Sequence, residues 1–523
     1  MTLTERRNLP IWKRLLGLLF TLIAFAVQIA LIVALVIFLF DYEQEVYKTI
    51  VGFIYFIAEV VAVIFVLYIV NKKMSMDYKL LWSVLILISP FVFCPIYLLN
   101  TTSRHFSNRK QRKIEKALGK YISLKQDVIE DDFIATNHLN VLQKQTYAPL
   151  YKNTEITFFN DILDKHNDML IALKRAKKFI LLEYFIFSKG YVYDSLYEVL
   201  KQKSDEGVII YILYDDVGTK GFISNGLMKK LAALKNVEVA AYQPLGLNIN
   251  LLVNYRDHRK ICCIDGIVSY CGGDNIADEY IHKIERFGYW RDNAAKYVGI
   301  ASLSFVKLFC EMWYISTKTD IKERFELDNY QTLLDEYNPK SNGYVVPFGD
   351  GPSIKGNPAY DLFRSLIANA NRYIYISTPY FIIDQEMRNL IALKAKSGVK
   401  VIILMPKIAD KKSVFWMAQN YMGELIDSNV IFYYYTPGFN HAKNIIVDDR
   451  YAFIGTINMD YRSLFLHYEC GALLVSNSVV DEMKKDFENA LLQSEIVTKE
   501  SLKKRNFMKK LIGGILNLFA PFF

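Results

Sequence analysis

The sequence predicts an α/β protein in which two pseudo-symmetric halves follow N-terminal transmembrane helices. Three observations lead to this prediction. Long apolar segments lie near the N-terminus, strands and helices alternate from about residue 150, and one motif occurs twice. The motif lies in "RDHRKICCIDGIVSYCGGDN" (256–275) and again, at the same offsets, in "HAKNIIVDDRYAFIGTIN" (441–458). The order strand, helix, strand, motif is found in both copies, which indicates an internal duplication of domain-sized units.

The apolar segments predict two membrane-crossing helices. Residues 15–40 carry no charge and residues 49–70 carry one, and both exceed the roughly 20 residues that a spanning helix needs. The first segment is too long for a signal peptide and lacks a small-residue cleavage site. A third segment, 80–99, contains Pro90 and Pro95. We expect it to be broken at proline and to re-enter the membrane or lie at its surface.

Basic residues set the expected orientation. Lys and Arg precede the first segment and follow the second, whereas the loop between them is mainly acidic. The positive-inside rule therefore places both ends in the cytoplasm. The most basic run of this region, "RHFSNRKQRKIEKALGK", follows the third segment and favours its return to the same side. We predict a multi-pass membrane protein with its two halves on the cytoplasmic side.

The composition restricts the partners. A net charge of +9 favours an anionic partner, either a phospholipid surface or a nucleic acid. The six cysteines show no metal-type spacing, and no Walker A, GxGxxG or HExxH motif occurs. The pair Asp215–Asp216 resembles a metal site but is more typical of a turn at the end of a strand. We therefore predict no metal and no cofactor.

These patterns divide the chain into five parts. The connector between the halves is the polar stretch around 318–345, which contains proline and glycine. The last residues, "KKRNFMKKLIGGILNLFAPFF", combine a basic start with an apolar end, which is typical of an interfacial helix on anionic lipid. Docking of this tail against the membrane segments is the alternative. The predicted parts are the membrane segments (1–100), a basic linker (101–150), the first half (151–330), the second half (331–500) and an amphipathic, membrane-associated tail (501–523).

The repeated motif has the residues that phosphoryl chemistry needs. Residues i and i+2 of a strand share a face, so each histidine and the following lysine point the same way. An imidazole can attack phosphorus or move a proton, and an ammonium and an amide can hold phosphate oxygens. An Asp-Gly turn folds the first copy back on itself and returns an asparagine to the site. The corresponding residues are His258, Lys260, Asp265 and Asn275 in the first copy, and His441, Lys443, Asp448 and Asn458 in the second.

Duplicated HxKxxxxD followed by GGxN or GTxN resembles the phospholipase D superfamily. The segments "NYRDHRKICCIDG", "GYWRDNAAKYVG", "ISTPYFIIDQEM", "YTPGFNHAKNIIVDD" and "GTINMDYRSLFLHYECG" resemble bacterial cardiolipin synthases, as does the N-terminal membrane region. The resemblance is strong from about 150 to 495 and looser before it. It implies two phospholipase D-like halves with mixed sheets flanked by helices.

The resemblance also implies an activity. Such enzymes transfer a phosphatidyl group between two phosphatidylglycerol molecules, which yields cardiolipin and glycerol, and they need no metal or nucleotide. One histidine forms a phosphohistidine and the other acts as general acid and then base. We assign His258 as the nucleophile and His441 as acid/base, although a pseudo-symmetric site leaves this order open. The family places an acidic residue behind each histidine, here Asp292 and Glu469.

The roles of four aspartates in and beside the motifs stay open. Asp265 and Asp448 belong to the catalytic motif, and on this reading they help to hold the turns. Asp257 and Asp274 stand where similar sequences usually carry Asn and an aromatic residue, so two extra carboxylates are expected near the anionic substrate.

Other activities fit the same motif. Hydrolysis by a phospholipase D or synthesis of phosphatidylserine would use the same residues. Two alternatives belong to other classes: a membrane-tethered nuclease and a catalytically silent lipid-binding scaffold. A nuclease has no evident need of the apolar N-terminal segments. A silent scaffold would not need two complete catalytic motifs. We predict phosphatidylglycerol and anionic membrane lipid as partners and no nucleic acid. The sequence leaves the oligomeric state open.

Overall fold

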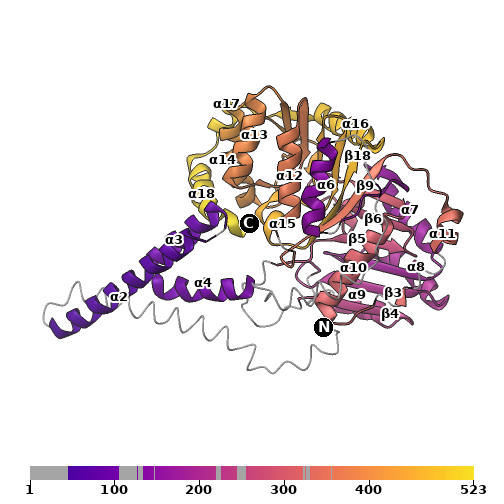
Figure 1. Cartoon of the computed structure of the whole chain (residues 1–523), viewed down its shortest axis with the longest axis horizontal. Helices are drawn as coiled ribbons and strands as arrows, with labels where there is room; N and C mark the ends of the chain where they lie inside the picture. Colours follow the sequence, from indigo (N-terminus) through magenta and orange to yellow (C-terminus); the bar gives the residue numbers. More distant parts are fainter. Residues whose placement is uncertain are drawn as a thin grey trace.

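The computed structural model describes residues 45–72, 74–104, 127, 133–146, 148–219, 225–243, 255–321, 324–325, 330–354 and 356–523. Three helices extend from the body of the molecule: α2 (Glu45–Val70), α3 (Met76–Ile88) and α4 (Pro90–Arg104) (Figure 1). Within the described residues, one stretch, Gly52–Val70, is long and apolar enough to cross a membrane. The first predicted span, 15–40, and most of the predicted basic linker lie outside the described residues.

The third apolar segment is divided into two helices. α3 ends at Ile88, and after Ser89 the chain starts α4 at Pro90, whereas Pro95 lies inside α4. The 13 residues of α3 rise about 20 Å, less than the ~30 Å hydrocarbon core of a bilayer. α3 lies beside α2, and α4 then leaves in another direction (Figure 1). This geometry supports a segment that turns back, and the re-entrant path itself stays a prediction.

The first half is built on a seven-stranded mixed sheet in the order β1-β8-β6-β5-β2-β3-β4. β2, β3 and β4 run parallel, and the other neighbours are antiparallel. The strands are β1 (Thr154–Phe159), β2 (Phe179–Tyr184), β3 (Ile209–Asp215), β4 (Val237–Tyr242), β5 (Lys260–Ile264), β6 (Val268–Gly272) and β8 (Ala294–Gly299). Three helices pack on its outer face: α7 (Ile162–Lys174), α8 (Tyr191–Asp205) and α9 (Asn225–Ala232).

The second half repeats this plan with eight strands in the order β19-β13-β12-β10-β15-β16-β18-β9. They are β9 (Tyr344–Asp350), β10 (Tyr373–Ser377), β12 (Lys400–Pro406), β13 (Ile431–Tyr435), β15 (Asn444–Val447), β16 (Tyr451–Gly455), β18 (Glu469–Val475) and β19 (Ser494–Ile496). Its outer face carries α12 (Pro358–Asn369), α13 (Gln385–Lys396) and α14 (Lys412–Ile426), and α6 (Phe133–Thr146) packs on α12.

The two sheets share a central core. Apolar side chains from the inner faces of both sheets pack around α10 (Ser302–Thr317) and α16 (Val479–Leu492). The body is thus layered as helices, sheet, helices, sheet, helices (Figure 1). Burying one face of each sheet against the same two helices fixes the halves relative to one another. The predicted architecture of two mixed sheets flanked by helices is confirmed.

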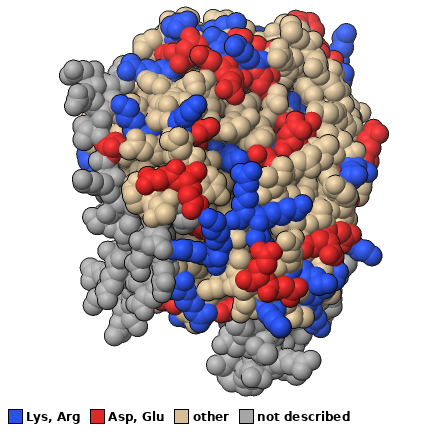
Figure 2. Space-filling model, turned by 90° about the vertical axis from the view of Figure 1, so that its right-hand side faces the viewer, with Lys and Arg blue, Asp and Glu red and all other residues tan. Residues whose placement is uncertain are grey.

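Short elements complete the described chain. They are α11 (Tyr330–Tyr337), α15 (Tyr461–Phe465), α17 (Lys499–Lys503), α18 (Phe507–Leu518), β7 (Tyr289–Arg291), β11 (Phe381–Ile382), β14 (Gly438–Asn440), β17 (Met459–Asp460), η3 (Asp278–Ile281) and η5 (Ala520–Phe522). On the face shown in Figure 2, Lys and Arg side chains are interspersed with Asp and Glu, so the positive net charge does not form one uniform basic surface there.

Candidate active site

The two histidines of the repeated motif lie just before equivalent hairpins. His258 precedes β5, which turns back into β6, and His441 precedes β15, which turns back into β16. The turns begin at Asp265 (φ 52°) and Asp448 (φ 56°), a left-handed conformation that aspartate tolerates better than most residues. The local sequence therefore forms an equivalent β-hairpin after each of the two histidines.

Strand pairing across the two halves brings these supports together. Asp257, directly before the first histidine, forms a parallel bridge with Tyr468 of the second half. β14 of the second half pairs in parallel with β7 of the first, with Asn440 opposite Arg291. The backbone N–H of His258 donates to the Tyr468 carbonyl (2.9 Å), and that of His441 donates to the Arg291 carbonyl (2.7 Å).

Each imidazole is held by a carboxylate from the opposite half. His258 Nδ1 lies 2.9 Å and 3.0 Å from the two carboxylate oxygens of Glu469. His441 Nδ1 lies 2.6 Å from Asp292 Oδ2. A neutral imidazole that donates its Nδ1 proton to a carboxylate keeps the lone pair of Nε2 for chemistry. The predicted pair of acidic residues therefore lies where the family resemblance expects it, and the pairing is crossed.

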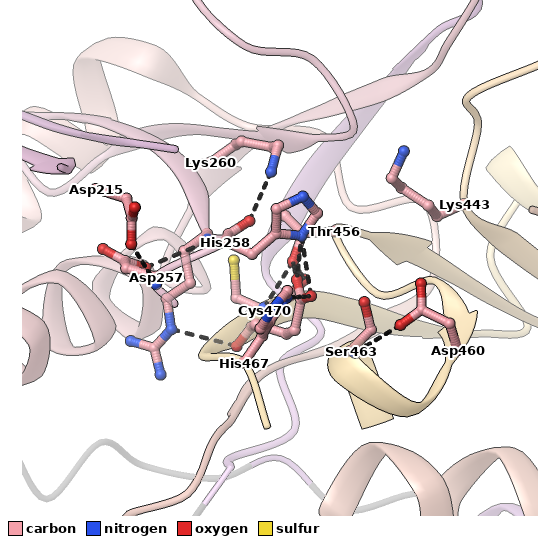
Figure 3. A network of polar contacts seen from close by, with 12 residues as sticks. Asp215, Asp257, His258, Lys260, Lys443, Thr456, Asp460, Ser463, His467 and Cys470 are labelled. Atoms are coloured by element: carbon pink, nitrogen blue, oxygen red, sulfur yellow. Dashed lines mark hydrogen bonds and ion pairs between the residues drawn. The ribbon is translucent and has the colours of Figure 1, made fainter. Parts of the chain in front are cut away.

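Lys260 and Lys443, the two lysines of the motif, lie beside the imidazoles. Lys260 Nζ donates to the His258 carbonyl at 2.7 Å, and Lys443 Nζ donates to the His441 carbonyl and lies 2.8 Å from His441 Nδ1. Figure 3 shows the two lysines on either side of the His258 ring. The histidine side chains keep 11% and 10% of their surface exposed, so a substrate can reach them.

The electrostatics of the site favour neutral imidazoles. Burial is the largest cause that lowers the pKa of His258 and His441 well below the usual value, and positive charges on the lysines, including Lys411, add to it. Burial also lowers the pKa of Lys443 to about 7 and raises that of Asp292 to about 6. A bound phosphodiester would offset the lysine charges and make a protonated imidazole easier to form.

The motif aspartates hold turns and do not contact the imidazoles. The carboxylate of Asp265 accepts three backbone N–H bonds of 2.7–2.8 Å from Lys177, Lys178 and Phe179, where β2 begins. Asp448 accepts the corresponding three bonds of 2.7–2.9 Å at the start of β10. They lie at the far end of β5 and β15 from the histidines, so they act on the site only through the strands.

The two asparagines of the motif differ in their contacts. Asn275 Oδ1 accepts the Ile186 N–H (3.0 Å), and its Nδ2 donates to the Tyr280 hydroxyl (2.6 Å). Asn458 is 5% exposed, and its Oδ1 has no hydrogen-bond partner within the described part of the chain. A role of these amides in binding phosphate stays a prediction.

The two extra carboxylates, Asp257 and Asp274, are buried. Asp274 is 3% exposed and forms a 2.7 Å ion pair with Lys165 of α7. Asp257 is fully buried, and its Oδ1 accepts the Arg259 backbone N–H. Both carboxylates are therefore engaged within the protein, and their effect on an anionic substrate stays a prediction. Asp215 accepts the turn amides of residues 217 and 218, as a strand-end residue does.

Sequence reasoning did not foresee the contacts that three residues make with the carboxylates, although two of them belong to the GGxN and GTxN motifs. Thr456 Oγ1 donates to Glu469 Oε2 at 2.5 Å, and His467 Nδ1 lies 3.6 Å from Glu469 Oε1 (Figure 3). Gly273, the counterpart of Thr456, leaves room for Asp292, since a Cβ there would lie 2.0 Å from Asp292 Oδ1. His467 has no copy in the repeat; its place two residues before Glu469 was the only available signal.

One group near the site has metal-binding residue types. The ligand atoms of His258, His467 and Glu469 lie within 4.8 Å of one another. Lys260 and Lys443 border the same space, and their positive charges oppose a cation there. The arrangement is better suited to an anion.

Comparison with known proteins agrees with this geometry. A family model described as cardiolipin synthase, PLD-like domain, matches residues 169–285 and 363–491, which carry the two motifs. Cardiolipin synthase 1 of Bacillus cereus is 30% identical over 505 residues, covering 94% of this chain and 97% of that protein. A cardiolipin synthase of Oceanobacillus iheyensis is 33% identical, covering 76% and 80%.

A solved structure shows the same fold. The phosphatidylserine synthase of Haemophilus influenzae matches with a TM-score of 0.55 and 14% identity, covering 74% of this chain and 97% of that one. With both motifs in place, and with relatives covered over 97% and 80% of their length, the chain belongs to the cardiolipin synthase family and is a phospholipid phosphatidyltransferase of the phospholipase D type.

Proposed function

We propose that this enzyme transfers the phosphatidyl group of one phosphatidylglycerol to a hydroxyl of a second, which gives cardiolipin and glycerol. The observation that carries the proposal is the crossed pair of imidazoles, each with Nδ1 bound to a carboxylate of the other half. The family membership supports cardiolipin synthesis and phospholipid substrates, and the geometry supports a two-step transfer.

In the first step, His258 Nε2 attacks the donor phosphorus. A P–N bond forms and the bond to the glycerol headgroup oxygen breaks. His441 gives a proton from Nε2 to that oxygen, and glycerol leaves. Asp292 stabilises the His441 imidazolium before this transfer, and Glu469 stabilises the positive charge that develops on His258.

In the second step, His441 takes the proton of the terminal hydroxyl of a second phosphatidylglycerol. The hydroxyl oxygen attacks phosphorus, the P–N bond breaks, and His258 is restored. Lys260 and Lys443 offset the negative charge on the phosphoryl oxygens in both steps. The acceptor is also a hydroxyl of a glycerol headgroup. The second step is therefore chemically the reverse of the first, with phosphatidylglycerol in the place of glycerol.

We place the enzyme in a bacterial membrane as a multi-pass protein with its catalytic halves on the cytoplasmic side. The family membership supports a membrane enzyme, and Gly52–Val70 supports one crossing. The asparagines Asn275 and Asn458 are assigned to the phosphate-binding side of the site.

A lipid product analysis tests this function. Membranes with the wild type, His258→Ala or His441→Ala receive phosphatidylglycerol as the only phospholipid, and products are measured by mass spectrometry. We expect cardiolipin and glycerol in equal amounts from the wild type and from neither variant. Phosphatidic acid as the product would mean that water is the acceptor and the enzyme is a phospholipase. No turnover by the wild type would contradict the proposal as a whole.

A further inference from the structure

The C-terminal helix presents an apolar surface that nothing in the described part of the chain covers. Phe507, Met508, Leu511 and Ile515 of α18 are 72%, 55%, 44% and 56% exposed. At 100° per residue they fall within one arc of the helix, together with the exposed Gly514. We call these five residues the α18 outer face. Isolated exposed apolar residues are common, whereas a continuous apolar face marks an interaction surface.

The opposite side of the same helix is docked. Gly513 is buried against α14, where a Cβ would lie 2.8 Å from the Trp416 carbonyl oxygen. Beyond α18, Phe519 and Phe522 pack on the apolar cluster of the N-terminal helices, and the Phe522 ring lies 6.0 Å from Trp82 of α3. The tail therefore joins the membrane helices, which is the alternative that its sequence left open, and still leaves its outer face free.

Position and charge indicate what covers this face. α18 and the C-terminus lie at the end of α2–α3 that meets the body, where a helix that crosses a bilayer would leave it (Figure 1). Lys503, Lys504 and Lys509 are exposed around the start of α18, and Lys510 borders the outer face. An apolar face with lysines beside it matches the boundary between acyl chains and anionic headgroups.

The tail is also connected to the start of β18, where Glu469 lies. Arg462 of α15 donates from Nε to the Phe522 carbonyl (3.0 Å) and from its backbone N–H to the Phe523 carbonyl (3.1 Å). The Arg462 carbonyl accepts the His467 N–H, and two residues later Glu469 holds His258. Tyr461, also in α15, donates its hydroxyl to Asp77 of α3. α15 thus links α3, the tail and the carboxylate of the site.

We propose that the α18 outer face inserts into the anionic lipid surface beside α2 and, through α15, holds the catalytic site at the level of the phospholipid headgroups. An interfacial contact of this kind would fix the height and tilt of the body relative to the lipid surface. It would let a lipid phosphate reach the imidazoles without leaving the bilayer.

Site-specific labelling of the full chain tests the contact. All six native cysteines are buried, so a cysteine introduced on the surface reacts selectively with pyrene maleimide. Leu511→Cys reports the outer face, and Leu492→Cys, an 86% exposed leucine at the end of α16, is the matched control. Both labelled proteins are placed in vesicles of phosphatidylglycerol and phosphatidylcholine that contain a nitroxide-bearing lipid.

We expect the nitroxide lipid to quench the pyrene at 511 strongly and the pyrene at 492 little. The double variant Leu511→Glu/Ile515→Glu should lose activity on vesicles but keep it on detergent-dispersed phosphatidylglycerol, whereas Leu492→Glu should keep both. Excimer emission at 511 without quenching would assign the face to a second copy of the chain and overturn the proposal. Equal, weak quenching at 511 and 492 would overturn it as well.

Discussion

Glu469 in the second half lies 2.9 Å from Nδ1 of His258 in the first, although 211 positions separate the two residues. Asp292 and His441 repeat this relationship in the opposite direction, at 2.6 Å. Neither half therefore contains both a motif histidine and the carboxylate that binds its Nδ1. The two halves have to be folded and packed on one another before either imidazole is oriented.

Removing either carboxylate charge should slow catalysis without unfolding the protein. We expect Glu469→Gln and Asp292→Asn each to lower kcat about 10²–10⁴-fold, because the amide cannot stabilise an imidazolium. Cardiolipin formation at saturating phosphatidylglycerol measures this, with circular dichroism to check folding. Glu495→Gln, a surface residue paired with Lys407, is the control and should change nothing. A kcat within twofold of wild type for both site variants would contradict the crossed arrangement.

The roles of the two histidines can be distinguished with a substrate whose leaving group needs no proton. A phosphatidyl ester of p-nitrophenol leaves as the phenolate without an acid. We expect His441→Ala to release one equivalent of p-nitrophenol in a burst and to stall, whereas His258→Ala releases none. Stopped-flow absorbance follows the burst, and mass spectrometry of the trapped enzyme locates the phosphoryl group. A burst from His258→Ala and none from His441→Ala would reverse the two roles.

The lysines around the site should set its pH optimum. Positive charge lowers the pKa of both histidines, and Lys411 contributes to each. A lower pKa keeps His258 neutral, and so nucleophilic, to more acidic pH, and activity is lost as pH falls through that pKa. Lys411→Met should raise both pKa values and move the acid and basic limbs of the kcat/KM profile to higher pH.

Lys412→Met is the matched control for this prediction. Lys412 is the neighbouring exposed lysine and is not among the principal charges that act on the two histidines. Its profile should coincide with that of the wild type. A Lys411→Met profile that also coincides with the wild type would show that the lysine charge does not reach the imidazoles.

The motif aspartates should affect stability more than chemistry. Asp265→Ala leaves three backbone N–H groups without their acceptor, and we expect a loss of about 2–4 kcal/mol in the free energy of unfolding. Asp265→Asn keeps one acceptor oxygen and tolerates the left-handed turn, so it should lose less. Denaturant unfolding measures both, beside kcat per folded molecule. A kcat loss as large as that of Glu469→Gln with unchanged stability would assign Asp265 to the chemistry.

The sequence by itself determined what depends on neighbouring positions. One spacing of histidine and lysine occurs twice, at His258 and Lys260 and at His441 and Lys443, and it predicted that both histidines are catalytic. The duplication predicted two α/β halves. Strand periodicity and the Asp-Gly turn are local, so they can be recognised without knowing what the strand packs against. Asp265 and Asp448 adopt the left-handed turn conformation for the same local reason, whereas their carboxylates reach the distant starts of β2 and β10.

Tertiary packing decided the rest. Asp257 and Asp274 lie beside motif residues, yet both are buried: Asp274 pairs with Lys165, and Asp257 accepts the Arg259 backbone N–H. The partner of each histidine depends on how two sheets pack around α10 and α16, and His467 enters the site only through that packing. Likewise, an amphipathic tail has the same composition whether it lies on lipid or on protein, and only the fold shows that one side of α18 is docked while the other is free.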